Sequence, residues 1–139
     1  MQVSSKKAFT MIELVYVIVV IGILSAIAIP KLAATRDDAT ITKAISTVAA
    51  ARSAISTTRQ KNILRGVFDD LNASSIGTNF SNLLEYNVTS CSTTGCEGWS
   101  TGGTATVPIF TFHGPTGDLN MTYQNKKLNC TSGCTDYGL

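Results

Sequence analysis

The hydrophobic residues are unevenly spread, and one apolar run dominates the first quarter of the chain. Glu13 is the only charged residue between positions 9 and 29, and residues 14–29 carry no charge at all. As an α-helix, residues 9–29 would extend roughly 31 Å, which matches the hydrocarbon thickness of a bilayer. The pattern therefore predicts a membrane-spanning helix over residues 9–29.

A helical pattern continues beyond this run, through residues 30–65. The apolar positions step by four, three and seven, which places them on one face of a helix: Ile41, Ile45, Val48 and Ile55. Gly66 is a typical stop signal for a helix. We therefore expect one long helix whose second half lies outside the membrane and packs its apolar face on a C-terminal domain.

The remaining residues, 66–139, change to a strand-like pattern. Residues 66–83 read as a connecting loop, and residues 90–106, which are rich in Ser, Thr and Gly and contain Trp99, read as an exposed loop. Turn residues at 114–117 and 124–126 predict two hairpins. The predicted strands are residues 84–89, 107–113, 119–124 and 127–131. The expected fold class is α+β, a long N-terminal helix on a small antiparallel sheet.

Charge is scarce and locally placed, which limits the classes of partner. Charged residues make up only 14% of the chain, and Lys6 and Lys7 precede the apolar run. Without residues 1–8 the chain has equal numbers of acidic and basic residues, so it lacks the basic surplus typical of nucleic-acid binding. Arg52 and Arg59, seven residues apart, could form a basic ridge for DNA, but a solvated helix face is the favoured interpretation.

Four cysteines lie in the last third as two close pairs, Cys91 with Cys96 and Cys130 with Cys134. Small exported domains use cysteines in this way to staple a limited core. Three connectivities are open; the local pairs are favoured because each brackets turn residues. A four-cysteine zinc site is the alternative, and the wide C-x4-C and C-x3-C spacings argue against it.

The N-terminal segment has two interpretations. Ala26-Ile27-Ala28 resembles an ordinary signal-peptidase site, and cleavage there would release a secreted, disulfide-stabilised binding module. Against this, the apolar run is long for a signal peptide, Pro30 would follow the first mature residue, and an export signal has no use for Glu13. The favoured interpretation is a permanent membrane anchor.

Glu13 is the most informative single residue. A carboxylate at the centre of a membrane helix costs roughly 2.5–3.5 kcal/mol, and somewhat less near its end, so a partner is expected. Cleavage between Ala8 and Phe9 would create an amine four residues from Glu13. Between staggered helices, that amine meets the carboxylate of a neighbouring copy in a low dielectric. The alternative is a carboxylate that reaches the lipid headgroups.

The segment Lys6-Lys7-Ala8-Phe9-Thr10-Met11-Ile12-Glu13-Leu14 resembles the cleavage and methylation signal of type IV pilins and type II secretion pseudopilins. The resemblance implies that residues 1–8 are a leader cut off before Phe9 by a prepilin peptidase. It implies N-methylation of Phe9 and an assembly role for Glu13. Gly22 and Pro30 match the positions where helices of this family are weakened; independently, Pro30 has no N–H for the Ala26 carbonyl. Ala8 departs from the usual Gly before the cut.

The resemblance implies a pilin-like structural subunit with no enzymatic activity and no cofactor. Its expected partners are other pilin subunits, identical or related, the prepilin peptidase and an inner-membrane assembly machinery. Nucleic acid is expected only for a DNA-uptake system. Before assembly the chain would cross the inner membrane once with its N-terminus in the cytoplasm. Afterwards it would lie in a filament in the periplasm or at the cell surface, serving adhesion, motility, DNA uptake or type II secretion.

Two smaller signals remain. His113 is the only histidine and has no nucleophile or metal-ligand pattern around it, so a role at a turn or strand end is expected. Three segments fit acidic-x-Asn-x-Ser/Thr and resemble the acceptor signal of bacterial N-glycosylation, around Asn72, Asn87 and Asn120. Asn72 is the candidate because the other two fall in predicted strands.

Overall fold

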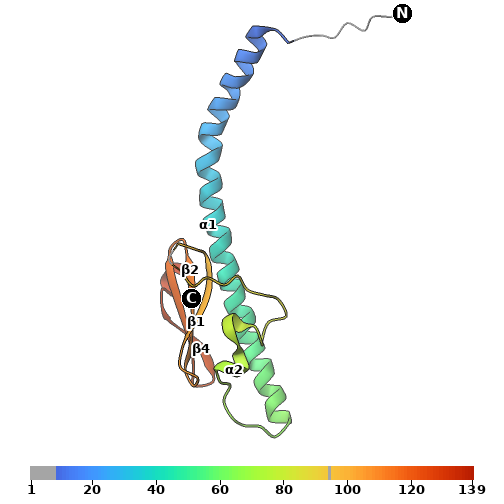
Figure 1. Ribbon diagram of the computed structural model, residues 1–139, viewed down its shortest axis with the longest axis vertical. Coiled ribbons are helices and arrows are strands. Elements are labelled where there is room, and N and C mark those ends of the chain that lie inside the picture. Colours follow the sequence, from blue (N-terminus) through green and yellow to red (C-terminus); the bar gives the residue numbers. More distant parts are fainter. Residues whose placement is uncertain (1–8, 94) are drawn as a thin grey trace, which may run out of the picture. The chain divides into compact units, whose positions relative to one another are not determined.

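The computed structural model describes residues 9–93 and 95–139 and has one long helix and one antiparallel sheet (Figure 1). Helix α1 runs from Met11–Leu64 without interruption through Gly22 and Pro30. The chain divides into two units, one ending at Asp37 and a body of residues Asp38–Leu139. The α+β fold class expected from the sequence is confirmed in this coarse form.

Helix α1 has a defined signal at each end. At its start, the Glu13 N–H donates a hydrogen bond to Thr10 Oγ1 at 3.3 Å, which caps the first turn. At its end, the Gly66 N–H bonds the Ile63 carbonyl and the Val67 N–H bonds the Asn62 carbonyl. This pair of bonds is a Schellman motif, and it needs the left-handed backbone that Gly66 adopts at φ +79°. The predicted stop signal is confirmed.

The sheet of the body is a meander in which each strand pairs with the next along the chain. β2 pairs antiparallel with β3 through Ile109↔Thr122 to Gly114↔Gly117. The β3–β4 turn consists of Asn125 and Lys126, both at positive φ, as a two-residue type I′ hairpin requires. The strands are β1 Gly98–Gly103, β2 Pro108–Gly114, β3 Gly117–Gln124 and β4 Lys127–Ser132. Short helical turns are α2 Ala73–Ile76, η1 Thr78–Phe80 and η2 Thr135–Tyr137.

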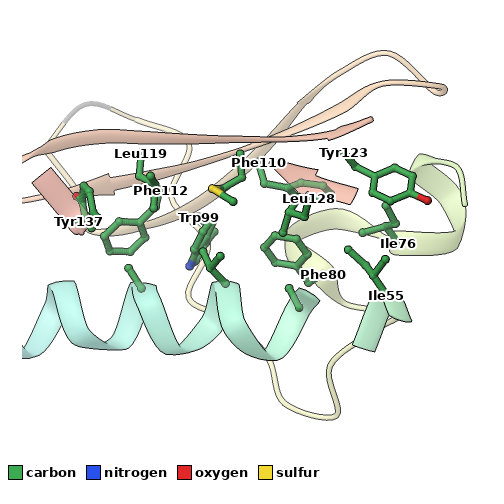
Figure 2. Close-up of a cluster of buried hydrophobic side chains, with 14 of the residues drawn as sticks. Ile55, Ile76, Phe80, Trp99, Phe110, Phe112, Leu119, Tyr123, Leu128 and Tyr137 are labelled. Atoms are coloured by element: carbon green, nitrogen blue, oxygen red, sulfur yellow. The ribbon is translucent and has the colours of Figure 1, made fainter. Parts of the chain in front are cut away.

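The core of the body lies between one face of α1 and one face of the sheet, as Figure 2 shows. Val48 and Ile55 of the predicted helical stripe are buried, and Ile41 and Ile45 pack at its margin. Ala44 and Ala51 complete the buried helix face. Their small side chains let the helix approach large residues of the sheet and of η1: Phe80, Trp99, Phe110, Phe112, Leu119, Met121 and Tyr123.

Two predicted features of the body are wrong. Residues 84–89 form no strand; Leu84 and Val88 pack against the core from an irregular segment. Residues 90–106 are not simply an exposed loop, because they contain β1, whose Trp99 is only 2% exposed. Trp99 contacts Phe80 and Phe112 with ring centroids 5.3 Å apart in both pairs, so this aromatic ring is a central core residue. The other three predicted strands and both hairpins are confirmed.

Candidate functional site

The N-terminal part of α1 is an apolar surface with a single carboxylate near its start. Nearly every large apolar side chain between Met11 and Leu32 is exposed, from 46% for Val17 to 84% for Met11. α1 is the one helix in the described part of the chain that is long and apolar enough to cross a membrane. The unit that ends at Asp37 therefore presents a surface that water disfavours and that lipid or other apolar helices would cover.

Glu13 lies in the first turn of α1, and its side chain is exposed. Among the described residues no cation or hydrogen-bond donor contacts its carboxylate. The positive end of the helix dipole favours a carboxylate here by about 0.3–1 kcal/mol, which offsets only part of its cost inside a membrane. Within residues 9–93 and 95–139 of one copy, the carboxylate therefore has only this partial compensation.

The other residues of the predicted assembly segment are placed as follows. Phe9 precedes α1, and its side chain is 80% exposed. Ala8 and the lysines before it lie outside the described residues, so the cleavage site stays a prediction. Gly22 and Pro30 lie inside α1, and a Cβ at Gly22 would meet nothing within 4 Å. Their role as weak points in a filament also stays a prediction.

Sequence reasoning missed the cap formed by Thr10. The signal was present, since Thr10-x-x-Glu13 is the pattern of a capping box. The structure shows one of its two bonds, from the Glu13 N–H to the Thr10 hydroxyl. Glu13 therefore contributes to the helix start through its backbone, independently of what its carboxylate does.

The four cysteines form two disulfides, Cys91 with Cys96 and Cys130 with Cys134. These are the local pairs favoured by the sequence. Each has Cα atoms 5.9 Å apart, and each closes one loop at the margin of the sheet. All four sulfurs are occupied by these bonds, so none is available as a thiolate for zinc.

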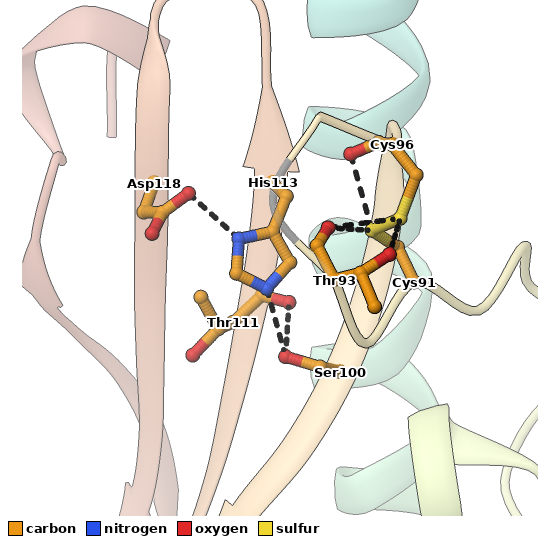
Figure 3. Close-up of a disulfide and its surroundings, with 7 residues drawn as sticks. All are labelled: Cys91, Thr93, Cys96, Ser100, Thr111, His113 and Asp118. Atoms are coloured by element: carbon orange, nitrogen blue, oxygen red, sulfur yellow. Dashed lines mark hydrogen bonds and ion pairs between the residues drawn. A yellow bond between two sulfur atoms is a disulfide. The ribbon is translucent and has the colours of Figure 1, made fainter.

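A line of hydrogen bonds crosses the outer face of the sheet at the end of β2 (Figure 3). His113 Nδ1 lies 2.8 Å from Asp118 Oδ1, and His113 Nε2 lies 3.1 Å from Ser100 Oγ. If Nδ1–H donates to the carboxylate, Nε2 accepts from the Ser100 hydroxyl. The three residues come from β2, β3 and β1, so they tie three strands together.

The Ser100–His113–Asp118 order is also that of a hydrolytic triad. Such a triad needs a substrate hollow beside the serine, with donors placed for an oxyanion. The hollow beside His113 is instead lined by the Cys91–Cys96 loop, Gly114, Pro115 and Asp118, without Ser100. The arrangement therefore fits the strand-end role expected of His113 better than catalysis.

Two buried tyrosines lie at the two ends of the sheet. Burial raises the pKa of Tyr137, and the nearby carboxylates of Asp118 and Asp136 raise it further; its hydroxyl donates to the Gly117 carbonyl at 2.7 Å. Burial also raises the pKa of Tyr123, as does Asp70, while Arg59 lowers it. Both tyrosines therefore keep their protons to a higher pH than an exposed tyrosine does.

Of the three candidate glycosylation positions, two are exposed. Asn72 is the N-cap of α2, where its Oδ1 accepts from the Ser75 N–H at 2.8 Å. Asn87 was expected in a strand but lies in an exposed irregular segment. Asn120 is in β3, and its side-chain amide donates to Ser132. The reason for preferring Asn72 over Asn87 is therefore wrong.

Comparisons of this chain with family models, with curated proteins and with solved structures found no match.

Proposed function

We propose that this chain is a structural subunit of a type IV pilus or a pilus-like pseudopilus. Its N-terminal helix would assemble with copies of itself or with related subunits. The observation that carries the proposal is the N-terminal part of α1, an apolar surface exposed on all sides, with one carboxylate in its first turn that has no partner among the described residues. A simple anchor would need the apolar surface but not the charge.

The apolar residues would leave the bilayer for a filament core. Lipid tails are as apolar as leucine, so this transfer changes little in hydrophobic energy, and helix packing decides the outcome. The long exposed run around Val17, Ile18 and Ile21 supplies side chains that neighbouring helices would cover. Such helices would pass directly from the bilayer into the bundle, without a stable soluble intermediate.

Glu13 would set the axial position of neighbouring subunits. Removal of residues 1–8 gives Phe9 a free amine, and Glu13 lies four residues further along. Pairing of one copy's carboxylate with another copy's amine displaces the two helices by roughly 6 Å along their axis. An ion pair in a low dielectric is strong but demands good geometry, so it selects one register among many similar apolar contacts.

The body would lie on the oxidising side of the inner membrane. Its two disulfides persist in the periplasm or outside the cell but not in a reducing cytosol. Before assembly the subunit would therefore cross the membrane with its N-terminus in the cytoplasm, where the prepilin peptidase and the assembly machinery meet it. Such a filament would serve adhesion, motility, DNA uptake or type II secretion.

The proposal is tested by expressing the full chain with a prepilin peptidase and an assembly machinery. Filaments sheared from the cells should contain this chain as a subunit, and a Glu13→Ala variant should be processed but absent from them. Recovery of the body as a soluble monomer beginning at Ile29 would instead support the secreted binding module.

A further inference from the structure

A basic cleft lies between α1 and the β3–β4 turn. Its volume is about 420 Å³, and four cations line it without any carboxylate: Arg52, Arg59, Lys126 and Lys127. Ile55 and Leu128 form part of its apolar lining. Arg52 is held in place, since its Nε donates to the Leu128 carbonyl at 3.2 Å. Two segments far apart in the sequence thus build one positively charged site.

A hollow of opposite charge lies beside the β2–β3 turn. Its volume is about 460 Å³, and Glu97 and Asp118 line it without any Lys or Arg. Asp136 is at the same end, because it precedes Tyr137, whose hydroxyl donates to the carbonyl of Gly117 beside Asp118. Lys43 is on the other side of Glu97, in a separate smaller hollow. We refer to the two sites as the basic cleft and the acidic hollow.

The two sites are at opposite ends of the body along its strands and along α1. Asp118 is the second residue of β3, and Lys126 lies in the turn that follows its last residue, Gln124, so the strand separates them by roughly 20 Å. On the helix side, Glu97 bonds Thr40 while the cleft contains Arg52 and Arg59, which lie roughly 18–28 Å further along α1. No contact between the two sites is possible within one body.

The body as a whole is neutral, which decides between two kinds of occupant for the basic cleft. Residues 38–139 contain seven basic and seven acidic side chains. A long polyanion such as DNA would be repelled by the acidic end and favours a surplus of positive charge. A second copy of the body carries a site of opposite charge, the acidic hollow. Segregated charge on a neutral body therefore favours self-association.

We propose that the basic cleft of one subunit faces the acidic hollow of another copy, head to tail, so that the exposed Lys126 and Lys127 of the β3–β4 turn reach into the hollow. This inference rests on the filament proposed above. Because the two surfaces differ, the contact is heterologous and continues as an open filament rather than closing a dimer. The copies it joins are displaced by roughly 18–28 Å along α1, several times the displacement set by Glu13. The Glu13–Phe9 ion pair and the contact between the basic cleft and the acidic hollow therefore join different pairs of subunits.

The direct test is zero-length cross-linking of purified filaments with a carbodiimide, which couples an amine to a carboxylate in contact with it. Peptide mass spectrometry should find Lys126 or Lys127 joined to Glu97, Asp118 or Asp136. Such a link must come from two subunits, given the separation of the sites within one body. Filaments that depend on Glu13 but lack this link would overturn the inference and leave the proposed function standing. Absence of any filament would overturn both.

Charge reversal gives a second test. Its rescue variant distinguishes loss of the contact from misfolding of the subunit. Lys126→Glu with Lys127→Glu should lower filament yield by about tenfold, and adding Glu97→Lys with Asp118→Lys in the same chain should restore it. Lys61→Glu with Arg65→Glu changes the charge equally outside both sites and should leave the yield unchanged. The inference would be contradicted if the control variant lost as many filaments, or if the rescue failed although the subunits were folded. DNA binding by the cleft without any cross-link would also contradict it.

Discussion

The backbone N–H of Glu13 donates to the side-chain hydroxyl of Thr10 at 3.3 Å, so the first turn of α1 is capped by its own sequence. Glu13 consequently has two separable roles. Its backbone and its position favour the helix start, whereas its carboxylate is available for a partner outside the chain. Loss of filaments in a Glu13 variant is informative only if the two roles are distinguished.

Thr10→Ala and Glu13→Gln distinguish them. Thr10→Ala should remove the cap, at a cost of about 1 kcal/mol, and leave filaments close to wild-type number because the carboxylate remains. Glu13→Gln keeps the length and the backbone bond but removes the charge, so we expect leader removal without filaments. Electron microscopy of sheared material gives the filament number. Abundant filaments from Glu13→Gln would refute the ion-pair role.

The disulfides should contribute similar stability because they close loops of similar length. Replacement of Cys130 and Cys134 by Ser should lower the free energy of unfolding of the body by about 2 kcal/mol, and replacement of Cys91 and Cys96 by about the same amount. Unfolding of the full chain in detergent can be followed by the fluorescence of Trp99, the single tryptophan, which is buried in the body. Non-reduced peptide mapping that finds Cys91 linked to Cys130 would contradict the pairing.

Trp99 itself should be among the most costly residues to truncate. Its ring contacts Phe80 and Phe112 and is 2% exposed. Trp99→Ala should cost about 3–5 kcal/mol, whereas truncation of the exposed Tyr86 should cost little. Urea denaturation followed by far-UV circular dichroism would measure both variants, and a small loss for Trp99→Ala would mean that β1 is not part of the core.

The two buried tyrosines offer a matched pair of substitutions. Tyr137→Phe removes the hydrogen bond to the Gly117 carbonyl and should cost about 1 kcal/mol. Tyr123→Phe should cost less, because no acceptor for the Tyr123 hydroxyl is found among the described residues. The difference in free energy of unfolding between the two variants is the quantity to measure; equal values would argue against the Tyr137 bond.

Alkaline pH should destabilise the body through the same residues. Burial, the first cause in both cases, raises the pKa of Tyr123 and of Tyr137 in the folded state. The unfolded chain therefore loses these protons first, at about pH 10, while the folded chain keeps them. The contribution of the two tyrosines to the free energy of unfolding is complete below that pH. It is lost as the pH rises through their pKa values in the folded state. Thermal unfolding from pH 8 to 11 should show this decline, and the Tyr137→Phe variant should show less of it.

The local signals in the sequence predicted the parts of the fold that depend on local chemistry. The spacing of Val48 and Ile55 identified the buried helix face, and Gly66 identified the end of α1. The β3–β4 hairpin was predicted from the short run of residues 124–126 between two strand-like segments, whereas the positive φ of Lys126 is not a preference of its residue type.

The missed parts depend on contacts between distant segments. β1 has three glycines in six residues, a composition typical of a loop, and it is a strand because Trp99 pairs with Phe112 of β2. Residues 84–89 have strand-like alternation but no neighbouring strand to pair with along the segment. Arg52 and Lys126 are separated by more than seventy positions, so the basic cleft appears only when α1 packs against the β3–β4 turn.

The most direct measurement is the N-terminal peptide of the protein recovered from cells that hold the peptidase. We expect a chain that begins at Phe9 with a methylated amine, because cleavage there places an amine four residues from Glu13 for the carboxylate of another copy. A mature chain that begins at Met1 or Ile29 would lack this amine and would contradict the ion pair between Phe9 and Glu13 of neighbouring copies.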